Sequence, residues 1–130
     1  MSIAQSFYTW LTANSAIGAI VSDRIYPQVI PQHEPARPAI TYSQEGGEYI
    51  EHLAGRSETR LSEFSVDCWA PTYLASRNLA ETLQTELVGV RGAFGSVTAE
   101  SVRLVNDFDG PPDNDTGLYR VSLRFEIAYY

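Results

Sequence analysis

The segment from Arg60 to Ala70 constrains the fold most strongly, because it reads as a strand that runs without a linker into a helix. Apolar and polar residues alternate along it, which is typical of a strand in a sheet that is buried on one side only. The apolar face consists of Phe64, Val66 and Cys68, and the polar face consists of Glu63, Ser65 and Asp67. Pro71 suits the first turn of the helix that follows. A strand, an abrupt turn and a helix packed back on the strand form the centre of an α+β domain.

The remaining elements follow from periodicity and turn chemistry. Ser2 and Gln5 have the spacing of a capping box, which predicts a first helix from Ile3 to Ala13. Residues 17–21 form at most a further short turn. Strands are predicted at 38–43, 61–69, 97–105 with a bulge around Glu100 and Ser101, and 119 to the C-terminal end, and a second helix is predicted from Pro71 to about Gly89. We therefore expect a four-stranded, mainly antiparallel sheet with two helices on one face, in the order α-β-β-α-β-β.

Loops are predicted between these elements. Residues 44–59 contain Gly46-Gly47 and mixed charge, which predicts a long, mobile hairpin connection. Residues 91–95 read as a turn, and residues 106–117 are rich in Asp, Asn, Pro and Gly, which is a turn composition. The chain of 130 residues is expected to form one domain.

Composition limits the class of protein. There are 16 acidic and 9 basic residues, a formal charge of −7, so tight binding of nucleic-acid phosphates is not expected as the main function. The N-terminal residues lack the features of a secretory signal, and no apolar run has the length of about 20 residues that spans a bilayer. We expect a soluble protein made in a reducing cytoplasm, with no membrane partner.

Three groups of residues have side chains that could support metal binding, catalysis or base stacking. Four aspartates and an asparagine could offer oxygen ligands to Ca²⁺, but their spacing does not match a known loop, and a hairpin loop explains them better. They are Asp107, Asp109, Asp113, Asn114 and Asp115. Cys68 with His33 or His52 could form a nucleophile and base, yet Cys68 lies on the apolar face of a strand. Tyrosines and phenylalanines near the C-terminus fit core packing better than base stacking. No catalytic, cofactor or metal site is predicted.

Several short segments, taken in order, resemble the tail-completion or tail-terminator proteins of long-tailed bacteriophages, and the likeness covers nearly the whole chain. The segments are Arg24-Ile25-Tyr26-Pro27, Pro38-Ala39-Ile40-Thr41-Tyr42, Val66-Asp67-Cys68-Trp69-Ala70-Pro71-Thr72-Tyr73 with Ala75 and Leu79-Ala80, Asp107-Phe108-Asp109, Gly117-Leu118-Tyr119-Arg120 and Phe125-Glu126-Ile127-Ala128-Tyr129. The resemblance implies a small structural subunit, with no catalytic residues, that forms a ring, usually a hexamer, at the head-proximal end of the tail. Such a ring stops growth of the tail tube and joins the tube to the head connector.

The size and charge of the chain are compatible with such a ring. A compact chain of this length has a radius of gyration of ~14 Å and is roughly 36 Å across. Six such subunits in a ring enclose a hole of about 36 Å, and four enclose about 15 Å. Six copies carry six times −7, or −42, and an acidic channel would let DNA phosphates pass without binding. We therefore expect DNA to pass through the ring in the neck of the virion.

Candidate contact residues follow from the same reasoning. Tyr49, Ile50 and Leu53, apolar residues in the predicted loop, are candidates for contact with a neighbouring subunit or the tail tube. The candidates for the channel wall or a subunit contact are Glu63, Ser65, Asp67, Asp107 and Asp109. Two other functions stay open: another neck or head-completion subunit of the same particle, or a ferredoxin-like ligand-binding domain.

Overall fold

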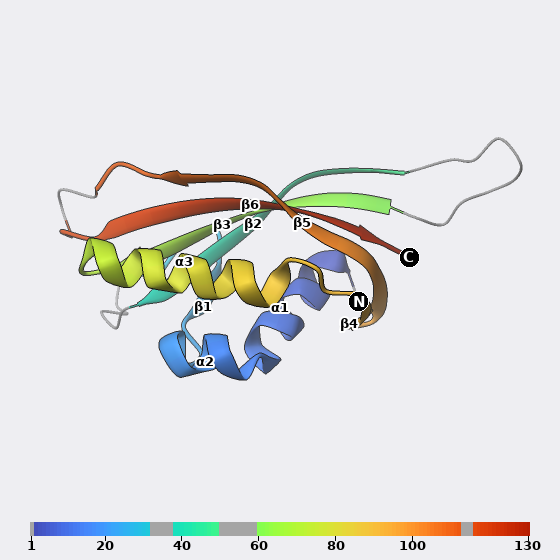
Figure 1. Ribbon diagram of the computed structural model, residues 1–130, viewed down its shortest axis with the longest axis horizontal. Helices are drawn as coiled ribbons and strands as arrows, with labels where there is room; N and C mark the ends of the chain where they lie inside the picture. The colour runs from blue at the N-terminus through green and yellow to red at the C-terminus, as the bar shows by residue number, and fades with distance from the viewer. Residues whose placement is uncertain (1, 32–37, 50–59, 113–115) are drawn as a thin grey trace, which may run out of the picture.

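The computed structural model describes residues 2–31, 38–49, 60–112 and 116–130; side chains of 47–49 are outside this description. In this part of the chain, three helices pack against one curled, half-barrel sheet of six strands (Figure 1). The elements are α1 (Ile3–Ala13), α2 (Ser15–Val21), β1 (Ile25–Pro27), β2 (Ala39–Tyr49), β3 (Arg60–Ala70), α3 (Tyr73–Leu87), β4 (Gly92–Phe94), β5 (Val97–Asp109) and β6 (Tyr119–Tyr129). The strand order is β1-β2-β3-β6-β5-β4.

The prediction of a four-stranded sheet with two helices is therefore wrong. The two extra strands, β1 and β4, are each three residues long, which is too short for an alternating pattern to identify them. The segment predicted as a turn at 91–95 contains β4, which pairs antiparallel with β5. β1 pairs parallel with β2, so the sheet is mixed. The extra helix, α2, is the segment at 17–21 that was expected to form only a turn.

The two longer helices begin where local chemistry satisfies their first N–H groups. The capping box at α1 is confirmed, because the Ser2 hydroxyl accepts from the Gln5 N–H and the Gln5 side chain accepts from the Ser2 N–H. At α3, Thr72 is the N-cap and its hydroxyl accepts from the Ala75 N–H (3.2 Å). Pro71 therefore precedes the helix, and its predicted place in the first turn is wrong.

The two central strands are regular, whereas their outer neighbours contain bulges. β3 and β6 pair in one unbroken antiparallel register over their whole length. The register shifts once in β2, at Glu45, and twice in β5, at Glu100 and Val105. The bulge predicted near Glu100 is confirmed. Residues 44–49, predicted as loop, continue β2, and residues 106–109, predicted as turn, continue β5, so both predictions are wrong there. Residues 50–59 lie outside the described part.

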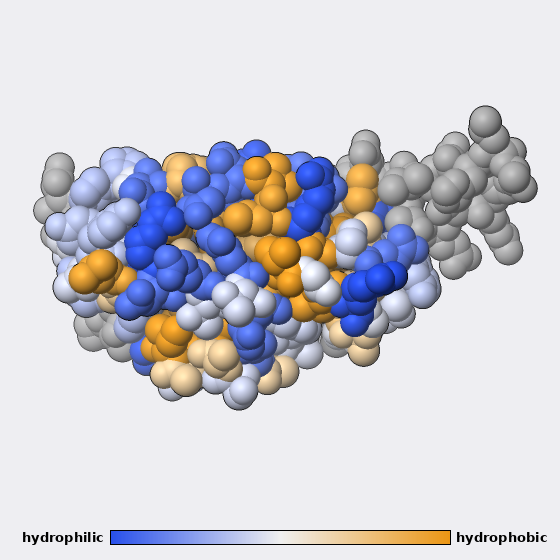
Figure 2. All heavy atoms as spheres, viewed as in Figure 1, coloured by the Kyte–Doolittle hydropathy of each residue, from blue (hydrophilic) through white to orange (hydrophobic). Residues whose placement is uncertain are grey.

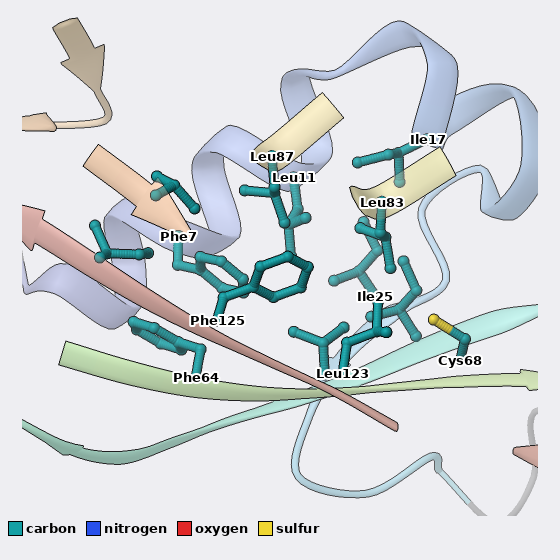
Figure 3. Close-up of a cluster of buried hydrophobic side chains, with 14 of the residues drawn as sticks. Phe7, Leu11, Ile17, Ile25, Phe64, Cys68, Leu83, Leu87, Leu123 and Phe125 are labelled. Atoms are coloured by element: carbon teal, nitrogen blue, oxygen red, sulfur yellow. The ribbon is translucent and has the colours of Figure 1, made fainter. Parts of the chain in front are cut away.

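The core lies between the helices and one face of the sheet (Figure 3). The Phe7 ring of α1 stacks on Phe64 of β3, with their centroids 4.3 Å apart. Leu83 and Leu87 of α3 point toward Leu123 and Phe125 of β6 from above the sheet. All six of these side chains are buried. The three helices therefore cover one face of the sheet and leave the other face without helices in the described part of the chain.

Candidate assembly surfaces

The uncovered face of the sheet, here called the open face, is built by every second residue of its central strands. Glu63, Ser65 and Asp67 of β3 lie on it and are half-buried, whereas the residues between them are buried under the helices. Cross-strand pairing extends this face, since Asp67 is opposite Ser122 and Ser65 is opposite Arg124. The alternation in the sequence thus identified the open face of β3 correctly.

Polar contacts cross the open face between neighbouring strands. The Ser122 hydroxyl donates to the Asp67 carboxylate (2.6 Å), and the Trp69 indole N–H donates to the Thr41 hydroxyl (3.0 Å). The Arg120 guanidinium lies over the Trp69 ring, 5.4 Å from its centroid. These contacts order the side chains and leave the face polar.

Basic and acidic side chains lie near one another on the open face. Arg103 of β5 donates to Glu126 of β6 (2.8 Å). This hydrogen bond is the largest cause of a raised pKa for Arg103, and the charges of Glu126 and Glu63 add to it. Arg124 of β6 is exposed and lies directly opposite Ser65 of β3. Glu126 and Glu63 therefore have a cationic neighbour in Arg103, whereas Asp67 is bonded to Ser122.

Asp107 and Asp109 lie on the other side of the sheet, with the helices. The Val105 bulge reverses the alternation of β5, so that Asp107 pairs with the buried Leu123. The Arg77 guanidinium of α3 donates to Asp107 (2.9 Å) and to Asp109 (2.5 Å). These carboxylates are thus separated from Glu63, Ser65 and Asp67 by the thickness of the sheet.

Arg77 is the centre of a polar cluster that sequence reasoning missed. Its pKa is raised, first by its hydrogen bond with the Tyr73 hydroxyl and then by those with the two aspartates. Tyr73 itself donates to Asp109 (3.0 Å), and the Gln84 amide donates to Asp107 (2.9 Å). The spacing of Tyr73 and Arg77, four residues apart on a helix, was the available signal. Their acidic partners come from a distant strand that no local pattern connects to them.

The predicted loop patch is only partly described. Tyr49 is the last residue of β2 and pairs with Arg60 of β3. Its side chain lies outside the described part, as do Ile50 and Leu53. Contacts of this patch therefore stay a prediction.

A groove of about 590 Å³ opens beside β1 at one side of the sheet. Side chains from α1, β1 and β2 line it, with three tyrosines and one acidic residue among them: Tyr8, Tyr26, Tyr42 and Asp23. Burial raises the pKa of the Tyr42 hydroxyl, and the neighbouring Tyr8 adds to this effect. The groove is of a size suited to a small ligand or a partner's side chains.

The residues considered from the sequence as a nucleophile, a base or metal ligands can now be located in the structure. Cys68 is fully buried under the helices, and burial raises the pKa of its thiol, which disfavours the reactive thiolate. His33, His52, Asp113, Asn114 and Asp115 lie outside the described part. Within that part, no cluster of three or more histidine, cysteine or carboxylate residues is arranged to hold a metal ion. Nor does any helix there have the length and apolarity to cross a membrane.

β2 and β5 each have a stretch whose outward-facing side no other described strand covers. β1 covers the outer side of β2 as far as Tyr42, whose carbonyl accepts from the Gln28 N–H (2.8 Å). β4 covers the first residues of β5, and the Gly89 N–H then donates to the Val102 carbonyl (3.0 Å). Residues 43–49 of β2 and 103–109 of β5 follow these points. We call them the free edges.

Comparison with known proteins identifies the family to which the chain belongs. No curated protein matches the chain. Among solved structures, a chain from the "Virion of native gene transfer agent (GTA) particle" has the same fold, with a TM-score of 0.73 at 15% identity over 98% of this chain and 91% of that chain. A family model described as "Tail completion protein gp17" matches residues 5–130. Since this match covers nearly all of the sequence, the chain belongs to the tail completion protein family and is a structural protein of the tail and neck region of a phage virion.

Proposed function

We propose that the protein forms a ring of six copies at the head-proximal end of the tail tube, where it ends tube growth. In this position the ring contacts the tail-tube protein on one side and the head connector or a head-completion protein on the other. The observation that carries the proposal is the family match over residues 5–130, because it assigns nearly the whole chain to tail completion. The ring has no catalytic role in this proposal.

DNA passes through the ring without specific binding. The formal charge of −7 per copy supports this, since phosphates are repelled rather than held. The open face, with Glu63, Ser65 and Asp67, lines the channel in this arrangement. Its mixed charge is suited to passage, because acidic side chains such as Glu63 and Glu126 lie among the arginines of this face. Asp107 and Asp109, held by Arg77, contribute to a contact at the end of the molecule where α3 begins.

The patch formed by Tyr49, Ile50 and Leu53 contacts the neighbouring subunit or the tail tube in this proposal. Its support is the apolar character of these residues between two polar stretches. A deletion of residues 48–54 is expected to abolish assembly of infectious particles. Intact assembly and infectivity after this deletion would remove the patch from the proposal.

The test is made with the purified full chain and growing tail tubes. Negative-stain images and sizing chromatography are expected to show rings, and added protein is expected to arrest tube polymerisation. Rings that leave tube growth unchanged would contradict termination and favour another neck position. A dimer with an occupied groove beside β1 would instead favour the ligand-binding alternative.

A further inference from the structure

We propose that neighbouring subunits join by strand pairing. In this arrangement the free edge of β2 in one copy, residues 43–49, lies beside the free edge of β5 in the next copy, residues 103–109. Each sheet then continues into the next around the ring. The inference rests on the proposed ring, because it describes how copies within that ring meet.

The strand order supplies the two different patches that a ring needs. Head-to-tail contacts in a closed ring join two distinct surfaces of each subunit. β1-β2 and β5-β4 are the opposite ends of the strand order, so the two free edges lie on opposite sides of the sheet. Unpaired N–H and C=O groups along such an edge are a template for a strand from another chain. Each subunit can thus offer one edge and accept the other.

The directions of β2 and β5 are also compatible with pairing between neighbouring copies. β2, β3, β6 and β5 pair antiparallel in succession, so β2 and β5 run in opposite directions. When rotation about a ring axis parallel to the strands brings β5 of one copy beside β2 of the next, the new pair is antiparallel. Antiparallel pairs have the better hydrogen-bond geometry of the two kinds.

The two free edges overlap in height along the sheet at residues 43–46 of β2 and 103–106 of β5. One cross-strand row runs from Ser43 through Ser65 and Arg124 to Asn106. A second runs from Gly46 through Glu63 and Glu126 to Arg103. Both ends of both rows lie beyond the segments covered by β1 and β4. A closed ring has no rise between subunits, so edges that are free at the same height can meet.

Charge is complementary between the two edges on the open face. Glu45, at the bulge of β2, is exposed, and the Ser43 hydroxyl donates to its carboxylate (2.7 Å). At the opposite edge Arg103 has a side chain that is 63% exposed, and the exposed Arg124 lies one strand further in. Opposite charges across neighbouring strands stabilise pairing and select the partner.

The side of the molecule that shows β5 and α3 has polar and charged side chains interspersed with apolar ones (Figure 2). Bulges at Glu45 and Val105, together with these charges, are features that blunt an edge against unspecific pairing. The edges are therefore suited to one matched partner, a second copy of this chain, rather than to an apolar ligand.

Cysteine cross-linking tests the contact. The double variant Ser43→Cys with Asn106→Cys places one thiol at each edge in the same cross-strand row, and the native Cys68 is buried and does not compete. Mild oxidation of assembled rings is expected to give a ladder of covalent oligomers on a non-reducing gel. The matched control, Ser43→Cys with Asn78→Cys on the exposed surface of α3, is expected to give no ladder.

Amide hydrogen exchange of the unmodified protein provides a second measurement. On ring formation, exchange in residues 43–46 and 103–106, where the two free edges share cross-strand rows, is expected to slow by about tenfold or more, while other exposed strand ends are unchanged. Rings without a ladder and without this protection would overturn the edge pairing and leave the proposed function standing. A protein that forms no ring, even when it caps tail tubes, would overturn both.

Discussion

The face of the sheet under the helices, here called the covered face, is stabilised by buried apolar side chains, whereas the open face has exposed polar contacts. In β3, Phe64 is fully buried and stacked on Phe7, whereas Glu63 and Ser65 on either side of it contact solvent and polar neighbours. Burial of large apolar side chains stabilises a fold by several kcal/mol each, but exposed polar pairs contribute about 1 kcal/mol or less. One strand can therefore hold the fold together with one set of residues and leave the other set available for assembly.

The largest expected effect is at the covered face. Phe64→Ala removes a ring that packs against α1 and should lower the free energy of unfolding by about 3 to 5 kcal/mol. Urea unfolding followed by tryptophan fluorescence measures this. The matched control is Phe108→Ala on the open face, where the ring is 48% exposed and the expected loss is below about 1 kcal/mol. Similar losses for both variants would break the comparison between the faces.

The next largest effect is a dependence of the free energy of unfolding on pH, caused by the Cys68 thiol that is buried under the helices. Burial raises the pKa of the Cys68 thiol in the folded protein, while the unfolded chain releases this proton above about pH 8.5. The folded state then binds more protons, so stability falls as pH rises, by about 1.4 kcal/mol per pH unit and about 2 kcal/mol at pH 10. Urea unfolding between pH 7 and pH 10 measures the slope.

Cys68→Ala is the control for this dependence. Its stability should stay flat to about pH 9, because tyrosines have an unperturbed pKa near 10 and titrate above that point. A slope that persists in this variant would assign the effect to other groups. Tyr42, whose pKa burial also raises, would be the first of these to examine.

A smaller effect is expected where α3 meets the end of β5. Arg77→Gln removes the contacts with Asp107 and Asp109, whose side chains are 30% and 47% exposed, so solvent screens much of the interaction. The expected loss is about 1 kcal/mol, decreasing in high salt. Thermal unfolding at low and high ionic strength measures it. Arg91→Gln, at an exposed position before β4, should change nothing measurable, and an equal loss there would point to net charge instead.

The smallest effect on stability is expected on the open face. Glu63→Gln should change the free energy of unfolding by less than about 0.5 kcal/mol, because Glu63 is only half-buried and Arg103 keeps its bond to Glu126. Urea unfolding measures this, and sizing chromatography of the same sample shows whether ring formation changes independently. A loss above 1 kcal/mol would show that the open face also stabilises the subunit.

Local chemistry explains which elements the sequence could predict. α1, the core of β3 and β6 were identified because each is long, and its pattern or cap lies within a few residues. β1, β4 and α2 were not, since segments of three to seven residues carry little periodic signal and are held by pairing or packing with distant segments. Gly46 and Gly47 indicated a loop, yet strand pairing with β3 keeps them in β2.

For the candidate contact residues, the sequence predicted the face of those in β3 and not the face of those at the end of β5. Strict alternation placed Glu63, Ser65 and Asp67 on one face, and their strand contains no bulge. Asp107 and Asp109 lie beyond the Val105 bulge, which shifts their side chains toward α3, where Arg77 binds them. Such a shift comes from tertiary pairing and leaves no mark in a period-two pattern.

The bulge at Val105 also makes the pairing of β5 a determinant of surface chemistry. If Val105 paired with Arg124 instead of bulging out, every later residue of β5 would move one place along β6, so that Asp107 would face Ser122 and Phe108 would face Val121. The aromatic ring of Phe108 would then turn inward against α3, and the carboxylates of Asp107 and Asp109 would join the opposite wall. Deletion of Val105 would leave both sets of side chains on their present faces, because Asn106 would then follow Leu104 directly and stay opposite Arg124. One unpaired residue thus decides whether this end of the molecule presents an aromatic or an acidic surface.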